Sequence, residues 1–246
     1  MIFEISRSKS IRNDLYKFWY RKNFSKCVDQ CYFTCFRWPV IQQETLLSFD
    51  PKLMNLPLKN VRIGGYLQSY CYFAQIIDEI RQEFTFQDQV SAAAAKILHD
   101  VYIKYNSSMV VGVHARRGDF LEKSWQDLGF RIPQKSYFMK AFSLMKSKFP
   151  GRKIVFIVAS NDYKWCRENL VSDDVILMQP ETPAVHLAVL SRCEHVIMSC
   201  GTFGWWAAWL ANGQVIYYTN FFGNGSLQQK VKVNQYYPPL WIGLDD

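Results

Sequence analysis

The segment MVVGVHARRGDF, residues 109–120, joins an unbroken apolar run to an abrupt cluster of charged residues. Short continuous apolar runs of this kind are typical of strands buried on both faces of a sheet. Four later runs share this character: residues 153–160, 174–179, 195–199 and 214–219. The stretches between the runs are long enough for helices: residues 134–149, 162–170, 183–193 and 204–212. Repeated strand–helix–strand units predict an α/β fold with a Rossmann-like parallel sheet covered on both sides.

The chain before Met109 has a different pattern. Residues 67–84 and 88–105 read as two helices, and the second has an apolar face. Residues 1–60 are rich in aromatic side chains and show no clean period. We therefore predict three parts: a remainder of another domain in residues 1–62, a helical connection in 63–108, and the sheet-containing domain in 109–246.

Composition limits the classes of function. Of 246 residues, 49% are hydrophobic and 20% charged, which is typical of a folded globular protein. The formal charge of +8 can reflect phosphate-bearing ligands, nucleic acid or anionic membrane, but the basic residues are scattered, so we expect no nucleic-acid partner. The cysteines lack paired CxxC spacing, so no zinc site is expected.

Targeting signals are weak in this sequence. No run of 18 apolar residues occurs, and the first residues carry charges where a signal peptide would be apolar, so we expect neither anchor nor signal here. Three sequons, at Asn23, Asn106 and Asn224, favour a secretory route only weakly.

The first cluster of chemistry-bearing residues follows the run that begins at Met109. His114, Arg116, Arg117 and Asp119 stand at the carboxyl end of the predicted strand, where parallel sheets bind ligands. The arginine fork suits phosphate because it donates parallel hydrogen bonds and stays charged. The alternative is a structural ion pair between Arg117 and Asp119 with Arg116 solvated. The position at a strand end favours anion binding.

Two further clusters also follow predicted strands. Ser160, Asn161 and Asp162 can cap the next helix or line a nucleobase or ribose. Gly201 and Thr202 open another helix, where glycine allows close backbone approach and free amides attract phosphate. The three loops together predict a diphosphate site.

These segments carry a resemblance to a known family. HARRGD (114–119), SNDYKWCREN (160–169) and HVIMSCGTFGWWAAWLANG (195–213), in this order, resemble the motif series of the glycosyltransferase family 11 α-1,2-fucosyltransferases. GGYLQSYCYF (64–73) is similar to the stretch that precedes the donor domain there. The resemblance extends from Ile63 to Trp241.

The resemblance implies a GT-B fold of two facing Rossmann-like domains on the lumenal side of the Golgi membrane. It implies inverting, metal-independent transfer of L-fucose from GDP-β-L-fucose to the 2-hydroxyl of a terminal β-galactoside on a glycan. Residues 109–246 would bind GDP-fucose, and residues 1–62 would be a truncated acceptor-side domain. No cofactor is expected beyond the donor substrate itself.

The resemblance also implies roles for single residues. Arg116 would bind the β-phosphate, while Arg117 and Asp119 hold its loop. The pyrophosphate cradle would be completed by Thr202 and by the amides around Gly201 and Phe203. The segment from Ser160 through Asn161 to Asp162 would line the nucleoside.

The residue that takes the proton from the acceptor hydroxyl is left open among Asp119, Glu122 and His114. The sequence also departs from the family pattern. It lacks the membrane anchor and the GxxGN segment of the first domain, and it carries His186 where relatives usually have Asp. An alternative function is therefore that of a catalytically inactive nucleotide- or glycan-binding relative.

Overall fold

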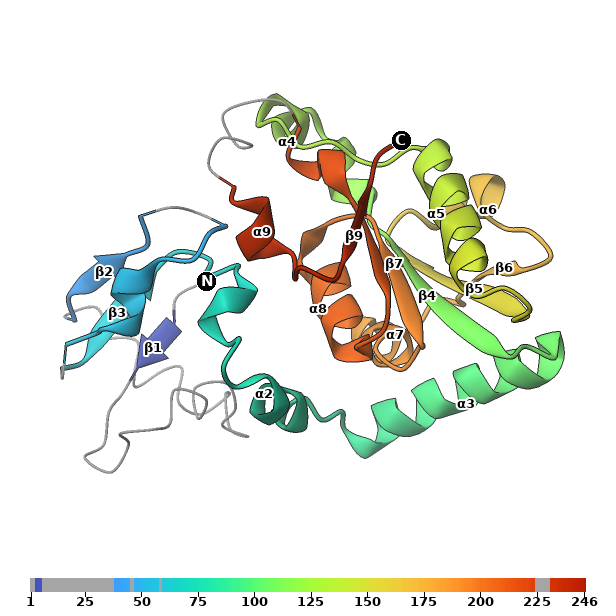
Figure 1. Cartoon of the computed structure of the whole chain (residues 1–246), viewed down its shortest axis with the longest axis horizontal. Coiled ribbons are helices and arrows are strands. Elements are labelled where there is room, and N and C mark those ends of the chain that lie inside the picture. The colour runs from blue at the N-terminus through green and yellow to red at the C-terminus, as the bar shows by residue number, and fades with distance from the viewer. Residues whose placement is uncertain (1–2, 6–37, 45–46, 58, 224–230) are drawn as a thin grey trace. The chain divides into compact units, whose positions relative to one another are not determined.

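The structure is a computed structural model that describes residues 3–5, 38–44, 47–57, 59–223 and 231–246. The chain divides into two compact units, one of residues 1–85 with 229–239 and one of residues 86–228 with 240–246 (Figure 1). The division falls inside the segment predicted to be a helical connection, and the three predicted parts stay a prediction.

The second unit is built on a parallel sheet of six strands in the order β6-β5-β4-β7-β8-β9. The strands are β4 (Met109–Ala115), β5 (Ile154–Ser160), β6 (Val175–Leu177), β7 (His195–Met198), β8 (Val215–Tyr218) and β9 (Ile242–Leu244). The first five confirm the predicted apolar runs. The edge strand β9 was not predicted, because an exposed glycine, Gly243, stands at its centre and none of its residues is fully buried. The predicted α/β fold with a Rossmann-like sheet is confirmed.

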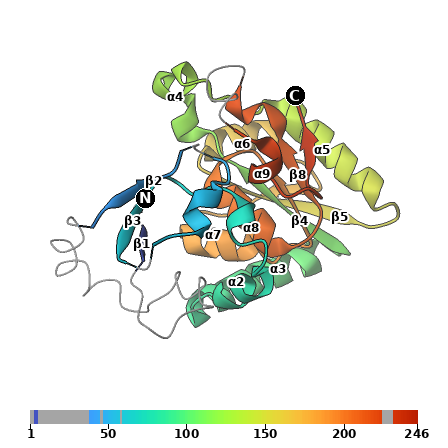
Figure 2. The ribbon, with the colours of Figure 1, turned by 60° about the vertical axis from the view of Figure 1, so that its left-hand side comes forward.

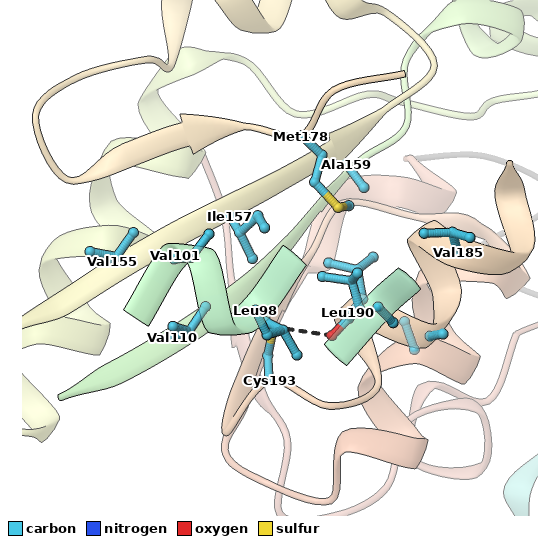
Figure 3. Close-up of a cluster of buried hydrophobic side chains, with 14 residues drawn as sticks. Leu98, Val101, Val110, Val155, Ile157, Ala159, Met178, Val185, Leu190 and Cys193 are labelled. Carbon is cyan, nitrogen blue, oxygen red and sulfur yellow. Dashed lines mark hydrogen bonds between the residues drawn. The ribbon is translucent and has the colours of Figure 1, made fainter. Parts of the chain in front are cut away.

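Helices cover both faces of this sheet (Figures 1 and 2). One face carries α3 (Asp88–Tyr105), α7 (Pro183–Leu190) and α8 (Gly201–Ala211), and the other carries α5 (Lys135–Lys148) and α6 (Tyr163–Asn169). Side chains of β5 alternate between the faces: Ile157 joins the cluster under α3 and α7 (Figure 3), while Phe156 packs on Phe142 of α5 with 4.5 Å between ring centroids. This alternation follows from the two-residue period of a strand.

Shorter elements complete the second unit. They are η3 (Gly118–Leu121), α4 (Lys123–Asp127) and η4 (Thr219–Phe222). Helix α3 ends at Asn106, which takes the left-handed conformation common at helix ends and is exposed. The sequons at Asn23 and Asn224 lie outside the described residues.

The first unit contains a three-stranded sheet in the order β1-β3-β2. Its elements are β1 (Phe3–Ile5), β2 (Val40–Gln42), η1 (Pro51–Met54), β3 (Val61–Gly64), η2 (Tyr70–Tyr72), α2 (Ile77–Glu83) and α9 (Val233–Tyr236). β3 pairs antiparallel with β1 and parallel with β2.

The single helix predicted for residues 67–84 is wrong, because only η2 and α2 are helical there. Leu67 adopts φ +49° and Ser69 is extended. The Ser69 hydroxyl donates to the carbonyl of Gln235 at 2.6 Å and accepts from the amide of Cys71 at 3.3 Å. A contact made far along the chain thus outweighs the local helix preference.

Candidate active site

Three strand ends bring the predicted clusters together. The strands β5, β4 and β7 are neighbours in the sheet, so the loops that follow them emerge side by side. The buried Ser199 hydroxyl accepts from the amide of Arg116 at 2.8 Å, which ties the loop after β4 to the loop after β7. The Ser160 hydroxyl donates to the carbonyl of Ala115 at 2.6 Å, which ties the loop after β5 to the same place.

Arg116 is held by a carboxylate and an aromatic ring. Its Nε donates to Asp119 Oδ1 at 3.1 Å and its Nη2 donates to Asp119 Oδ2 at 2.6 Å. The guanidinium carbon lies 4.9 Å from the centre of the Phe120 ring. The Arg116 guanidinium lowers the pKa of the Asp119 carboxyl by hydrogen bonding, so that this carboxylate stays charged. Nη1 is the end of the fork that Asp119 does not use.

Gly201 places that free end against the start of α8. A Cβ atom on Gly201 would lie 3.0 Å from Arg116 Nη1, and Gly201 has φ +80°, a conformation that favours glycine. Cys200, the residue before α8, makes no side-chain capping bond. The first amides of a helix have no intrahelical partner, so α8 offers donors beside the Arg116 cation. This combination is suited to binding a phosphate.

Arg117 has a different environment from the one considered in the sequence. The alternative of an Arg117–Asp119 ion pair is wrong: Arg117 Nε lies 3.5 Å from Asp162 Oδ2, and Asp119 pairs with Arg116. The Arg117 guanidinium stacks 3.6 Å above Trp165 and donates from Nη1 to the carbonyl of Pro133 at 2.7 Å. The two consecutive arginine side chains therefore differ in direction: Arg117 is buried against Trp165 of α6, while Arg116 points toward Gly201 at the start of α8. Burial lowers the pKa of Arg117.

The loop after β5 contacts the loop after β4. Asp162 caps α6 by accepting from the amide of Trp165 at 3.2 Å. Asn161 Oδ1 accepts from the amides of Arg117 at 2.9 Å and Gly118 at 3.2 Å. Asn161 Nδ2 donates to Asp119 Oδ1 at 3.1 Å. The contact with a nucleoside predicted for Ser160, Asn161 and Asp162 stays a prediction.

His114 lies inside the sheet end and is only 6% exposed. A Cβ on Gly204 would stand 2.3 Å from His114 Nδ1, so α8 can rest on the imidazole only because residue 204 is glycine. The Phe203 ring lies 5.2 Å away, centroid to centroid. Among the described residues Nδ1 has no hydrogen-bond partner. Burial first, and the charge of Arg116 second, lower the pKa of His114 to about 3, so the ring is neutral at physiological pH.

The other residues singled out in the sequence are also placed. Thr202 is exposed in the first turn of α8, and Glu122 is exposed at the start of α4. His186 lies on α7 with Nε2 at 3.2 Å from the carbonyl oxygen of Gln179. Sequence reasoning missed Phe120 and Trp165, the rings that hold the two guanidiniums. The sequence shows that each segment contains an aromatic residue, but it does not indicate which arginine each ring contacts.

No three histidine, cysteine, aspartate or glutamate side chains in the described part of the chain are grouped so as to hold a metal ion. No helix among the described residues has the length and apolar character needed to cross a membrane.

Comparison with known proteins places this site in a family. The sequence model described as "Glycosyl transferase family 11" matches residues 50–245. The chain is 33% identical over 205 residues to galactoside alpha-(1,2)-fucosyltransferase 2 of Pongo pygmaeus, covering 79% of this chain and 58% of that one. It is 32% identical over 194 residues to galactoside alpha-(1,2)-fucosyltransferase 1 of Ateles belzebuth, covering 75% of this chain and 52% of that one.

The chain therefore spans between 52% and 58% of the length of these two relatives. A solved structure of NodZ alpha-1,6-fucosyltransferase soaked with GDP-fucose is 15% identical, with a TM-score of 0.37 over 57% of this chain and 48% of that chain. Because the family's sequence model covers most of the chain, including all three strand-end loops, the chain belongs to glycosyltransferase family 11.

Proposed function

We propose that this chain supplies the GDP-fucose-binding half of a galactoside α-1,2-fucosyltransferase. The observation that carries the proposal is the position of Arg116 Nη1 beside Gly201 and the uncapped start of α8. A cation and free amides at one point suit a diphosphate. The names of the relatives, galactoside alpha-(1,2)-fucosyltransferases, support L-fucose as the transferred sugar and a galactose-terminated glycan as the acceptor.

The proposed reaction is a displacement with inversion. The 2-hydroxyl oxygen of the galactoside attacks C1 of fucose, and the bond from C1 to the β-phosphate oxygen breaks. GDP leaves with the electron pair, and the hydroxyl proton passes to a base. Arg116 and the first amides of α8 stabilise the charge that develops on the leaving phosphate, which is the role a metal ion plays in other transferases. We therefore propose that no metal is required.

Asp119 serves this site by fixing Arg116. Its carboxylate occupies two donors of the guanidinium, and the lowered pKa makes it a weak base. The neutral imidazole of His114 is likewise a weak base, with a pKa of about 3, and is buried under Gly204. Glu122 is the exposed member of the three candidates. The proton acceptor remains a prediction among these three.

We propose that the protein that contains this chain acts on the lumenal side of the Golgi membrane with a GT-B arrangement of two domains, and membership of glycosyltransferase family 11 supports this proposal. The alternative, an inactive nucleotide- or glycan-binding relative, predicts that GDP-fucose binds and that no fucosylated galactoside forms. Transfer to a panel of galactosides, with the linkage of any product determined by NMR, separates the two functions.

Calorimetry with GDP, GMP and GDP-fucose tests the proposed phosphate site. Both diphosphates should bind more tightly than GMP, which lacks the β-phosphate. Arg116→Lys should weaken GDP binding about 10- to 100-fold, because one ammonium cannot hold Asp119 and a phosphate together and a charged hydrogen bond contributes about 1.5 to 3 kcal/mol.

Arg152→Lys is the matched control. Arg152 precedes the amino end of β5, at the opposite end of the strands from Arg116, where it bonds to Ser108. Its replacement should therefore leave GDP binding unchanged. Equal affinities for GDP and GMP, or an Arg116→Lys variant that binds GDP like the wild type, would contradict the proposal.

A further inference from the structure

Both the oxygen and the nitrogen of the Asn161 side-chain amide bond to the loop that carries Arg116. The oxygen accepts from two consecutive backbone amides, those of Arg117 at 2.9 Å and Gly118 at 3.2 Å. The nitrogen donates to Asp119 Oδ1 at 3.1 Å. One side chain of the loop after β5 thus contacts three successive residues of the loop after β4.

The contact with Asp119 extends to Arg116. Asp119 Oδ1 accepts from both Asn161 Nδ2 and Arg116 Nε, while Asp119 Oδ2 accepts from Arg116 Nη2. Asn161 therefore fixes the rotation of the carboxylate, and the carboxylate fixes the plane of the guanidinium. With that plane set, Nη1 is directed toward Gly201.

The glycine of the RRGD motif fits this arrangement. A Cβ on Gly118 would lie 2.9 Å from Asn161 Nδ2 and 3.3 Å from the Asn161 carbonyl oxygen, closer than side chains normally approach. Residue 118 must therefore be small for the amide to enter the loop. Asn161 itself is exposed, so its side-chain amide remains accessible to water.

An amide is the functional group that suits these three partners. Two backbone N–H groups require an acceptor, and the Asp119 carboxylate requires a donor. Aspartate at this position would keep the acceptor but would bring a second carboxylate within hydrogen-bond distance of Asp119. The charged group bonded directly to the Asn161 side chain is Asp119, which is in turn bonded to Arg116.

We propose that Asn161 is a positioning residue that orients Arg116 toward the donor's β-phosphate through Asp119, and that it does not read the nucleoside. The proposal rests on the phosphate role of Arg116 proposed above. It departs from the sequence-based expectation that Asn161 lines the nucleoside, and it assigns the asparagine of the SND segment to the phosphate end of the site.

Binding of GDP and GMP to single and double variants tests this role. Asn161→Ala should weaken GDP binding about 5- to 10-fold and leave GMP binding within about 2-fold, since GMP has no β-phosphate for Arg116 to hold. In an Arg116→Lys background, Asn161→Ala should add less than about 2-fold, because the residue acts through Arg116.

Asn161→Asp is the second variant. It keeps the acceptor for the two amides and so preserves the loop, but it repels Asp119, and we expect it to lose GDP affinity at least as much as Asn161→Ala. Asn106→Asp, an exposed amide at the end of α3, is the matched control and should bind GDP like the wild type.

Three results would overturn the inference: equal loss of GMP and GDP binding in Asn161→Ala, which would indicate direct nucleoside contact; additive losses in the double variant; or wild-type GDP affinity in Asn161→Asp. Each of these leaves the wild-type preference for GDP intact. Failure of the wild-type chain to prefer GDP over GMP would instead refute the proposed phosphate site, and the inference with it.

Discussion

The buried imidazole of His114 makes a quantitative prediction about acid stability. In the folded chain its pKa is lowered from 6.5 to about 3, mainly by burial. In the unfolded chain the ring has its ordinary pKa and takes up a proton first as the pH falls. His114 therefore leaves stability intact above the unfolded pKa and lowers it progressively as the pH falls from 6.5 toward 3.

The size of the effect follows from linkage. At about pH 5 the solution is roughly 1.5 pH units below the unfolded pKa, and each unit corresponds to about 1.36 kcal/mol, so the folded state loses about 2 kcal/mol. The full shift would correspond to about 5 kcal/mol near pH 3. Replacing His114 with glutamine, which does not titrate, should remove this part of the pH dependence.

Urea unfolding at a series of pH values, followed by tryptophan fluorescence from α8, measures the contribution of His114 to the pH dependence of the unfolding free energy. Between about pH 7.5 and about pH 5 the wild type should lose about 2 kcal/mol more unfolding free energy than His114→Gln. The quantity that tests the prediction is the difference between the two slopes of unfolding free energy against pH, because the substitution also changes the contact with Gly204. His99→Gln, an exposed site on α3, should keep the wild-type slope. Parallel pH curves for wild type and His114→Gln would refute the buried neutral imidazole.

Three further predictions concern the loops around Arg116. Gly201→Ala should lower the unfolding free energy by about 1 to 2 kcal/mol because of the positive φ at this residue, and should also weaken GDP binding by displacing Arg116. Gly151 has a similar φ (+79°) with open space around it, so Gly151→Ala should lose stability but not GDP affinity; equal GDP binding by the two variants would contradict the contact between residue 201 and Arg116. Arg117→Ala should lower the unfolding free energy by about 2 to 4 kcal/mol, because it leaves the buried carbonyl of Pro133 and the half-buried Asp162 without their partner. Arg167→Ala removes an exposed guanidinium 4.9 Å from a tyrosine ring and should cost less than about 1 kcal/mol in urea unfolding; similar losses would show that the burial of Arg117 contributes little. GDP binding measured by calorimetry should be unchanged in EDTA, and a loss restored by Mn²⁺ would show that a metal is required.

Local pattern was sufficient for much of the fold and for the position of the site. Five of the six strands of the sheet, β4 to β8, lie in continuous apolar runs, so their burial is encoded in adjacent residues. Parallel strands place their carboxyl ends at one edge of the sheet, and for that reason the sequence predicts that the clusters around Arg116, Ser160 and Gly201 lie together. The ordered motifs also identified the family, because residue order along a chain needs no knowledge of contacts.

Other features depended on residues distant in sequence. Within the segment 67–84 the extended Ser69 is bonded to the carbonyl of Gln235, and the edge strand β9 pairs with β8. Neither partner is visible in a local window of sequence.

Partner choice within the site was likewise decided by tertiary structure. The sequence determined that two arginines and a carboxylate follow a buried strand. Only the fold decided that Asp119 holds Arg116, that Arg117 lies on Trp165, and that His114 is neutral beneath Gly204. The physical reason is that hydrogen bonds, stacking and desolvation act over a few ångströms in space, and those distances are set by the packing of α6 and α8 on the sheet rather than by spacing along the chain.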